Sequence, residues 1–283
     1  MSNKFEFKLP NGVSVRTGNI APSVKLTSSF KEYPESSLMT DDEIRQVLSN
    51  PNRKRSRKIY TQDWILNQGR RSSCNAYACA GAMMRLRNRK GLKRKEFAPE
   101  FLYMQINDGQ DQGSHLEKGL RAGTEIGMPL KGTVPFESYS LDQLNMETKR
   151  FAGQEASNYR YLEAYALPCN NLETLWRAAI TATLRREQLV LAVHVGSNYM
   201  QSPTGTWAEA GFDDGPGNHA VGADDAIAAD NWNNIMDIRI DQYGSWTPSH
   251  GEKGRVLINP RHLDEPSNYH THYAIRSIIS EKE

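Results

Sequence analysis

Residues 68–78 read QGRRSSCNAYA, a polar, glycine-containing loop that leads into a predicted helix with a cysteine at the junction. The helix is predicted over 74–88, because apolar residues recur at i, i+3, i+4 and i+7 from Cys79 onward. The first N–H groups of a helix are unpaired and lie at the positive end of its dipole, which favours a thiolate there. We therefore predict that Cys74 is reactive and that Cys79, on the apolar face, is an inert buried thiol.

Composition and cysteine count narrow the class of protein. The 283-residue chain has a formal net charge of +2, with 38% hydrophobic and 24% charged residues, so we expect a globular protein and no nucleic-acid partner. Three cysteines are too few, and odd in number, for a disulfide framework. With no signal peptide and no apolar run near the ~18 residues of a membrane span, we expect a cytoplasmic or otherwise reducing location and no membrane partner. Packaging into a virion is the alternative.

Periodicity and turn residues divide the chain into a helical first half and a β-rich second half. Residues 1–58 are interpreted as an N-terminal extension with a small hairpin around Asn11-Gly12, and their basic run 52–58 as a solvated linker. The remainder, 59–283, predicts an α+β protein with a helical lobe (about 59–170) and an antiparallel β lobe (about 171–283). Helices are predicted at 40–48, 98–103, 114–122 and 172–185, and strands at 189–195, 219–223, 236–240 and 255–258.

A thiolate nucleophile requires a base and a group that orients it. Gly217-Asn218-His219 places a histidine where a glycine-containing loop meets a predicted strand, which is a suitable position for lining a cleft. Another predicted strand ends in Asp241-Gln242-Tyr243-Gly244. His219, at this junction, and Asp241, the carboxylate at a strand end, are therefore candidate partners of the thiolate.

Taken in order, these features resemble the papain-like (C1-type) cysteine peptidases. That family has a glutamine and a glycine before its nucleophile, and its histidine and asparagine lie roughly 130–150 residues downstream. His219 falls within that separation from Cys74, and Asp241 falls slightly beyond it. The similarity covers residues 59–260 and also includes the stretches 98–103, 112–120, 127–136, 189–195 and 251–258.

The resemblance implies a two-lobed papain-like fold and the roles of individual residues. Cys74 would attack a peptide or isopeptide carbonyl, His219 would carry the proton, Asp241 would orient the imidazole, and Gln68 would donate to the oxyanion. The resemblance further implies no cofactor or metal and a protein or peptide as the partner. It leaves residues 1–58 either as a docking arm or as a segment across the cleft. The implied substrate-binding residues are Gly113, Ser114, Asn218 and Tyr243, with Tyr243 covering the contact between His219 and Asp241.

The sequence departs from the family pattern and leaves alternatives open. Asn75 stands where the family has an aromatic residue, the usual cysteine before the nucleophile is absent, and Asp241 replaces asparagine. A catalytically silent papain-like fold, acting as a binding or structural component of an assembly such as a virion, is the alternative function. A transglutaminase-like or NlpC/P60-like enzyme is disfavoured, since its cysteine and histidine lie much closer together. The histidines at 250, 262, 270 and 272 fit no metal-ligand spacing and are interpreted as surface residues, and Asp213-Asp214 and Asp224-Asp225 as solvated loops.

Overall fold

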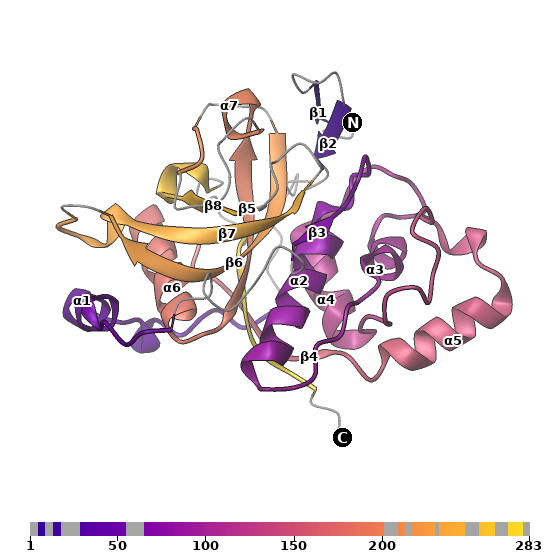
Figure 1. The fold of residues 1–283 in the computed structure, drawn as a ribbon, viewed down its shortest axis with the longest axis horizontal. Helices are drawn as coiled ribbons and strands as arrows, with labels where there is room; N and C mark the ends of the chain where they lie inside the picture. The colour runs from indigo at the N-terminus through magenta and orange to yellow at the C-terminus, as the bar shows by residue number, and fades with distance from the viewer. Residues whose placement is uncertain are drawn as a thin grey trace.

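Helix α2 (Cys74–Arg89) is the buried axis of the molecule (Figure 1). In the computed structural model, every residue from Cys74 to Arg87 is buried. Helices of the first half pack on one side of α2 and a β-sheet on the other. Because both sides are covered, the single apolar stripe predicted for this helix is too narrow, and small residues fill the positions between. The structure describes residues 5–8, 14–17, 29–54, 65–200, 209–212, 217–229, 232–246, 255–263 and 271–279.

Three further helices complete the helical lobe: α3 (Pro99–Ile106), α4 (Leu116–Glu125) and α5 (Met146–Ala156). Pro99 occupies the first turn of α3, where its missing N–H removes no helical hydrogen bond. Asn145 caps α5, because its side chain accepts a hydrogen bond from the Thr148 N–H at 2.8 Å. Across the described residues, no helix is both long and apolar enough to cross a membrane.

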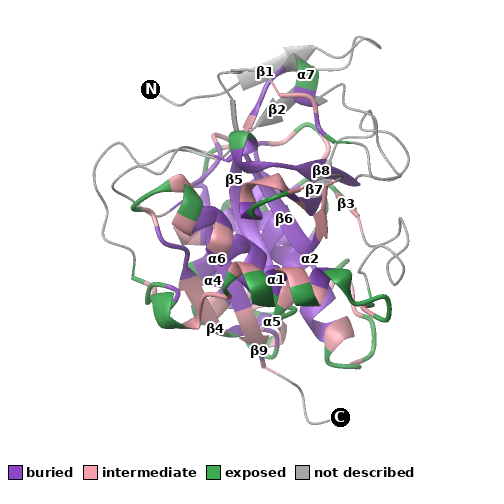
Figure 2. Ribbon diagram, turned by 90° about the vertical axis from the view of Figure 1, so that its left-hand side faces the viewer, coloured by how far each residue is buried: buried purple, intermediate pink, exposed green. Residues whose placement is uncertain are grey.

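A seven-stranded sheet, built mainly from the second half of the chain, has the order β3-β7-β6-β5-β9-β4, with β8 pairing with β7. All pairs are antiparallel except β3 with β7, which confirms the predicted antiparallel lobe. Figure 2 shows β5 and β6 buried at the centre of the molecule. The strands are β3 (Leu66–Asn67), β4 (Tyr161–Ala166), β5 (Gln188–Val195), β6 (Gly217–Ala228), β7 (Ile238–Trp246), β8 (Arg255–Ile258) and β9 (Tyr273–Ile278), and the short helix α7 (Ser197–Met200) follows β5.

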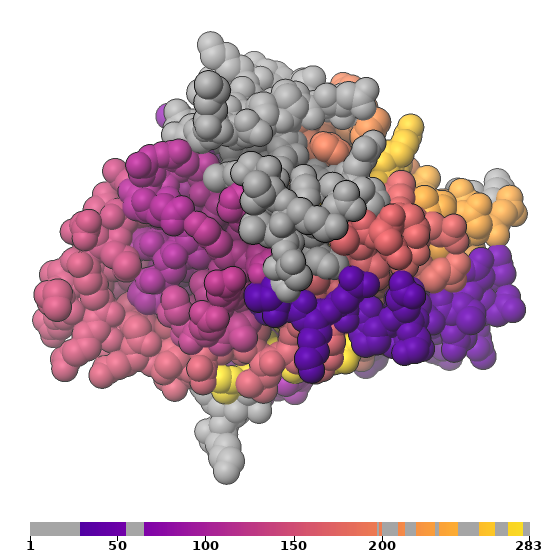
Figure 3. Space-filling view, turned by 180° about the vertical axis from the view of Figure 1, so that it is seen from behind, coloured from indigo at the N-terminus to yellow at the C-terminus, as the bar shows by residue number. Residues whose placement is uncertain are grey.

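Residues 29–54 pack into the core of the β lobe rather than extending from it. Helix α1 (Asp41–Ser49) packs against α6 (Leu172–Leu184), and Tyr33 and Ile44 are fully buried in the same cluster as the sheet residues. The Tyr33 N–H donates to the Ala166 carbonyl at 2.8 Å. Figure 3 shows this segment, in indigo, along the surface of the β lobe. The predicted boundary at residue 58 therefore does not mark the edge of the core.

The predicted N-terminal hairpin is present. Strands β1 (Phe5–Lys8) and β2 (Ser14–Thr17) pair antiparallel, with Phe5 opposite Thr17. Strand β2 approaches β6, and Figure 1 shows the hairpin at the top of the molecule, above β3. The hairpin is thus near the strand on which His219 lies, and not beside α1.

A buried cluster of charges joins α2 to the sheet. Arg85 of α2 and Asp224 of β6 form an ion pair at 3.1 Å with both side chains fully buried. Arg255 of β8 contacts Asp224 at 3.2 Å and Asp241 of β7 at 2.6 Å. Arg53, from the N-terminal segment, pairs with Asp225 at 2.6 Å. The sequence interpretation of Asp224-Asp225 as a solvated loop is therefore wrong: their carboxylates lie on a buried strand and are neutralised by arginines that are distant in sequence.

Two of the histidines interpreted as surface residues are buried. His262 has no exposed surface and His272 is 3% exposed, while His250 and His270 lie outside the described residues. The His262 Nδ1 accepts from the Asn259 N–H at 3.2 Å, and its Nε2 lies 3.1 Å from the Ala210 carbonyl, to which it donates. Burial lowers the pKa of His262 below its usual value of 6.5. The imidazole is consequently kept neutral in the fold.

Replacing His262 with glutamine is expected to flatten the pH dependence of stability in the mildly acidic range. Unfolded His262 binds a proton near pH 6.5 and folded His262 does not, so its contribution to stability is complete above pH 6.5 and declines as pH falls below it. The check is urea denaturation of both proteins between pH 7.5 and pH 5. Equal slopes of unfolding free energy against pH would contradict this account.

Candidate active site

Cys74 is the first residue of α2 and is fully buried. Its Sγ accepts a hydrogen bond from the backbone N–H of Ala220, on β6, at 3.4 Å. The start of α2 therefore contacts β6 through the Cys74 sulfur. This placement agrees with the predicted loop-to-helix junction and leaves the first-turn N–H groups of α2 around the thiol.

His219 lies on β6 immediately before Ala220 and is 2% exposed. It stands opposite Val193 in the register with β5. Because consecutive α-carbons are about 3.8 Å apart, the contact between Cys74 and Ala220 also brings His219 beside the cysteine. Cys74 on α2 and His219 on β6, which were predicted as nucleophile and base, thus lie close together in the fold.

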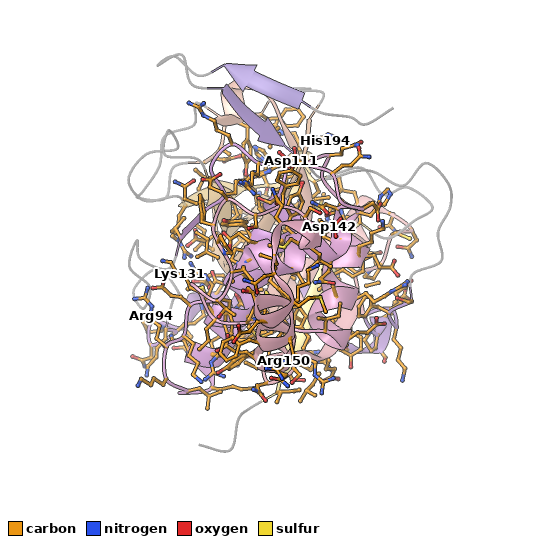
Figure 4. All side chains as sticks on the ribbon, turned by 90° about the vertical axis from the view of Figure 1, so that its right-hand side faces the viewer. Arg94, Asp111, Lys131, Asp142, Arg150 and His194 are labelled. Carbon is orange, nitrogen blue, oxygen red and sulfur yellow. The ribbon has the colours of Figure 1, made fainter. Side chains whose placement is uncertain are left out.

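Asp111 anchors the loop that precedes the cysteine. Its Oδ1 accepts from the Ser72 N–H at 3.0 Å and from the Tyr103 hydroxyl at 2.7 Å. The same hydroxyl accepts from the Gly113 N–H at 3.2 Å. Burial, together with the charge of Asp111, raises the pKa of Tyr103, so its hydroxyl stays protonated as a donor. Sequence reasoning missed Asp111, which Figure 4 labels; its position directly before the Gln112-Gly113-Ser114 segment was the available signal.

Asn75 follows Cys74, at the position where the papain-like peptidases have an aromatic residue, and its polar side chain has a structural role. Its buried side-chain amide donates to the Ser114 Oγ at 3.0 Å and to the His115 carbonyl at 2.8 Å. The predicted substrate-binding Ser114 is itself only 2% exposed and uses its hydroxyl in this contact. Gly113, with φ +88°, adopts the left-handed conformation that glycine permits. Asn75 therefore fastens the Gly113 segment to α2.

Adding a methyl group at Gly119 is expected to disturb this contact. A Cβ on that residue of α4 would lie 2.2 Å from the Asn75 Oδ1, and the Asn75 amide is held by two hydrogen bonds. Gly119→Ala should lower the free energy of unfolding by about 1–3 kcal/mol through overpacking. Chemical denaturation is the measurement, with Gly153→Ala on α5 as control, since that Cβ meets nothing within 4 Å. Equal effects of the two substitutions would contradict the close approach.

Gln68 follows β3 and is 1% exposed. Its Nε2 donates to the Arg71 carbonyl at 2.7 Å, which folds the loop back toward the cysteine. β3 in turn pairs with the end of β7, with Asn67 opposite Trp246. Gln68, predicted as the oxyanion donor, is therefore held between the cysteine loop and the sheet.

Asp241 is not beside His219, and the prediction that it orients the imidazole is wrong. In the register of β6 with β7, Asp241 stands opposite Asp225, six residues along β6 from His219. Six residues of strand span about 20 Å. The Asp241 carboxylate is instead occupied by Arg255, at 2.6 Å. Asp241 belongs to the buried ion cluster.

The end of β7 lies between β6, which carries His219, and β3, which directly precedes Gln68. Gly244 stands opposite Val221, and β7 continues through Ser245-Trp246 between β6 and β3. Ser245-Trp246 matches the middle of the Asn-Ser-Trp-Gly run of the papain-like peptidases, and that match puts Gly244 at the asparagine position. The dipeptide was the signal that sequence reasoning overlooked. The side chains of Asn218 and Tyr243 lie outside the described residues, so their predicted roles stay predictions.

The other two cysteines differ from Cys74 in their surroundings. Cys79 is fully buried, and burial raises its pKa to about 12. Cys169 is partly buried, and none of the three cysteines, all described, is joined in a disulfide. Within the described part of the chain, no group of three or more histidine, cysteine, aspartate or glutamate residues is arranged to hold a metal ion.

Comparison with known proteins identifies similar folds. No family model matches the sequence, and a search of curated proteins also finds no match. Among solved structures, xylellain, a cysteine protease from Xylella fastidiosa, is 15% identical with a TM-score of 0.58, covering 92% of this chain and 96% of that one. Procathepsin B S9 from Trypanosoma congolense is also 15% identical with a TM-score of 0.58, covering 93% and 87%. The cysteine protease and lectin-like domains of Cwp84 from Clostridium difficile are 16% identical with a TM-score of 0.56, covering 91% and 55%.

Proposed function

We propose that this chain, whose fold is that of the papain-like cysteine proteases, is itself a peptidase with Cys74 as nucleophile and His219 as base. The observation that carries the proposal is the hydrogen bond from the Ala220 N–H to the Cys74 Sγ at 3.4 Å. It brings a thiol at a helix start next to a histidine at a strand start, and these are the two groups that thiol-dependent acyl transfer requires. The substrate class would be a protein or peptide.

The reaction would pass through a thioester. His219 takes the proton of Cys74, and the sulfur bonds to the substrate carbonyl carbon, whose oxygen becomes negatively charged. When this intermediate collapses, the C–N bond breaks and the leaving amine takes the proton from the imidazolium. A water molecule then attacks the thioester, gives its proton to His219, and releases the acid product and the thiol.

The oxyanion would be stabilised by two donors, one at the start of α2 and one on the loop that precedes it. The backbone N–H of Cys74 lies in the first turn of α2, and Gln68 carries a side-chain amide. One N–H of that amide donates to the Arg71 carbonyl, and the NH₂ group has a second N–H. Gln68 is held in place by this contact and by its burial, so little reorganisation would accompany the reaction.

Gly244 at the asparagine position supports a second candidate function. A glycine has no side chain with which to orient an imidazole, so the proposed peptidase acts through a Cys-His pair. The same substitution would fit a papain-like fold that binds peptides or a partner without cleaving them. The two functions share the fold and differ in the reactivity of Cys74.

Alkylation separates these two functions. Intact mass is measured after brief treatment with limiting iodoacetamide near pH 6, on the wild type and on Cys74→Ala. The peptidase predicts one fast adduct that the substitution removes. Cys79, with a pKa of about 12, has a thiolate fraction of about one in ten thousand even at pH 8, so Cys79→Ala is the matched control and should label like the wild type. Slow labelling shared among the three cysteines would support the binding function.

A further inference from the structure

A pocket of about 720 Å³ opens on the helical lobe beside the cysteine loop. This volume lies within the range of small-molecule and side-chain binding sites. Its residues come from β3 and the residue before it, from the first turn of α2, from residues 94–97 and the start of α3, and from the loop 131–136. None of the residues assigned above to catalysis lines it.

The walls of the pocket are apolar and its floor is polar. Phe97, Val134 and Phe136 contribute apolar surface, and Phe136 is 51% exposed. The floor contains Glu100, 7% exposed, which accepts a hydrogen bond from the Tyr77 hydroxyl. Burial raises the pKa of Glu100. A large apolar side chain of a peptide matches the apolar part of this surface.

The rim carries an excess of positive charge. Arg94 and Lys131 both bind the Glu96 carboxylate, at 2.9 Å and 2.7 Å. Figure 4 shows Arg94 and Lys131 on the same edge of the molecule. Two cations share one carboxylate, so a second carboxylate would be attracted to the rim. Lys131 is 70% exposed at its side chain and can reach a ligand.

The pocket continues from the candidate active site. Asn67, in its lining, directly precedes Gln68, and Tyr77 lies one turn, about 5 Å, along α2 from Cys74. Asn75, which holds the Gly113 segment, and Tyr77 are about 200° apart around the helix. Gly113 and the pocket therefore lie on opposite sides of α2 near the cysteine.

We propose that this pocket is an extended substrate-binding site, which takes a large apolar side chain of the peptide next to an acidic residue, on the opposite side of the scissile bond from Gly113. The inference rests on the proposed function for its place in catalysis, but binding to the pocket does not require reactive chemistry. An extended peptide that leaves Cys74 past Gln68 and Asn67 reaches Phe136 and Lys131. The site thereby selects substrates by two adjacent residues.

The test uses full-length Cys74→Ala, which cannot turn over, and two probes: N-acetyl-Phe-Glu-amide and N-acetyl-Phe-Lys-amide. Backbone amide shifts are followed by NMR during titration to 20 mM. We expect saturable shifts at Leu66, Asn67, Lys131 and Val134, with at least threefold tighter binding of the acidic probe. Shifts that do not saturate, or that lie elsewhere, would overturn the proposal.

Matched variants assign the binding to the pocket. Phe136→Ala should weaken the acidic probe at least fivefold, whereas Phe151→Ala, at a 57% exposed phenylalanine on α5, should not. Lys131→Glu should remove the preference for the acidic probe, and Lys118→Glu, at a lysine paired with Asp108, should keep it. Saturable binding with an unreactive Cys74 in the wild type would retain the pocket and reject the peptidase. A reactive Cys74 without saturable binding would support the peptidase and reject the pocket as a binding site.

Discussion

Replacing His219 with alanine is expected to lower kcat/KM for peptide hydrolysis by at least about a hundredfold, because proton transfer by a positioned base contributes that much or more. The substitution removes the imidazole of the residue that precedes Ala220 and leaves the backbone contact from Ala220 to the Cys74 sulfur in place. The measurement is turnover of a fluorogenic peptide library, accompanied by thermal denaturation to confirm folding. Activity within threefold of the wild type would contradict the assignment of His219 as the base.

Asp241→Asn is the informative contrast to this variant. It weakens the fully buried ion pair with Arg255 and should lower the free energy of unfolding by about 3–5 kcal/mol. Because Asp241 stands opposite Asp225 and not near His219, kcat/KM of the folded protein should stay within about threefold. A large loss of kcat/KM with unchanged stability would restore Asp241 to the catalytic site.

Deleting residues 1–58 is expected to prevent folding. The deletion removes Tyr33 and Ile44 from the core of the β lobe, and it removes Arg53 and with it the ion pair to Asp225. Each lost large side chain costs about 2–5 kcal/mol and a broken buried pair about 3–5, which together approach or exceed the stability of a typical domain. Circular dichroism and thermal denaturation would show an unfolded chain or insoluble product.

Deleting only residues 1–28 is the matched control for that experiment. This shorter deletion keeps Tyr33, α1 and Arg53, so the β-lobe core described here stays complete. We expect a cooperative unfolding transition close to that of the full chain. If both deletions folded equally well, residues 29–54 would be dispensable and their packing would contribute little.

The sequence predicted much of the fold because many elements carry local signals. The strand expected at 255–258 matches β8, the helix expected at 74–88 matches α2 within one residue, and the helix expected at 40–48 matches α1, which Thr40 and Glu43 cap. Strands β4 and β9 were missed, since they pair with each other and neither shows a clean alternation of apolar and polar residues. Their pairing joins segments far apart in the chain.

Long-range partners also explain the errors at the candidate site. Arg85 gives no local signal of its burial, because its ion-pair partner Asp224 lies in the other half of the chain. Asp241 was chosen by residue type, whereas its position relative to His219 depends on strand register. Cys74, His219 and Gln68 were predicted from local sequence, because each lies at or near the end of a predicted helix, strand or loop, and their catalytic roles stay predictions.

The position of β9 has a consequence for synthesis. This strand, at residues 273–278, lies inside the sheet between β5 and β4, although it comes after every other strand in the chain. A chain emerging from the ribosome can form α2 early, but the sheet that brings His219 to Cys74 lacks an internal strand until these residues appear. Since domains fold as units during translation, the nascent chain would not present a paired nucleophile and base. For the proposed peptidase, the order of strands would thus delay any cleavage until the whole sheet has been synthesised.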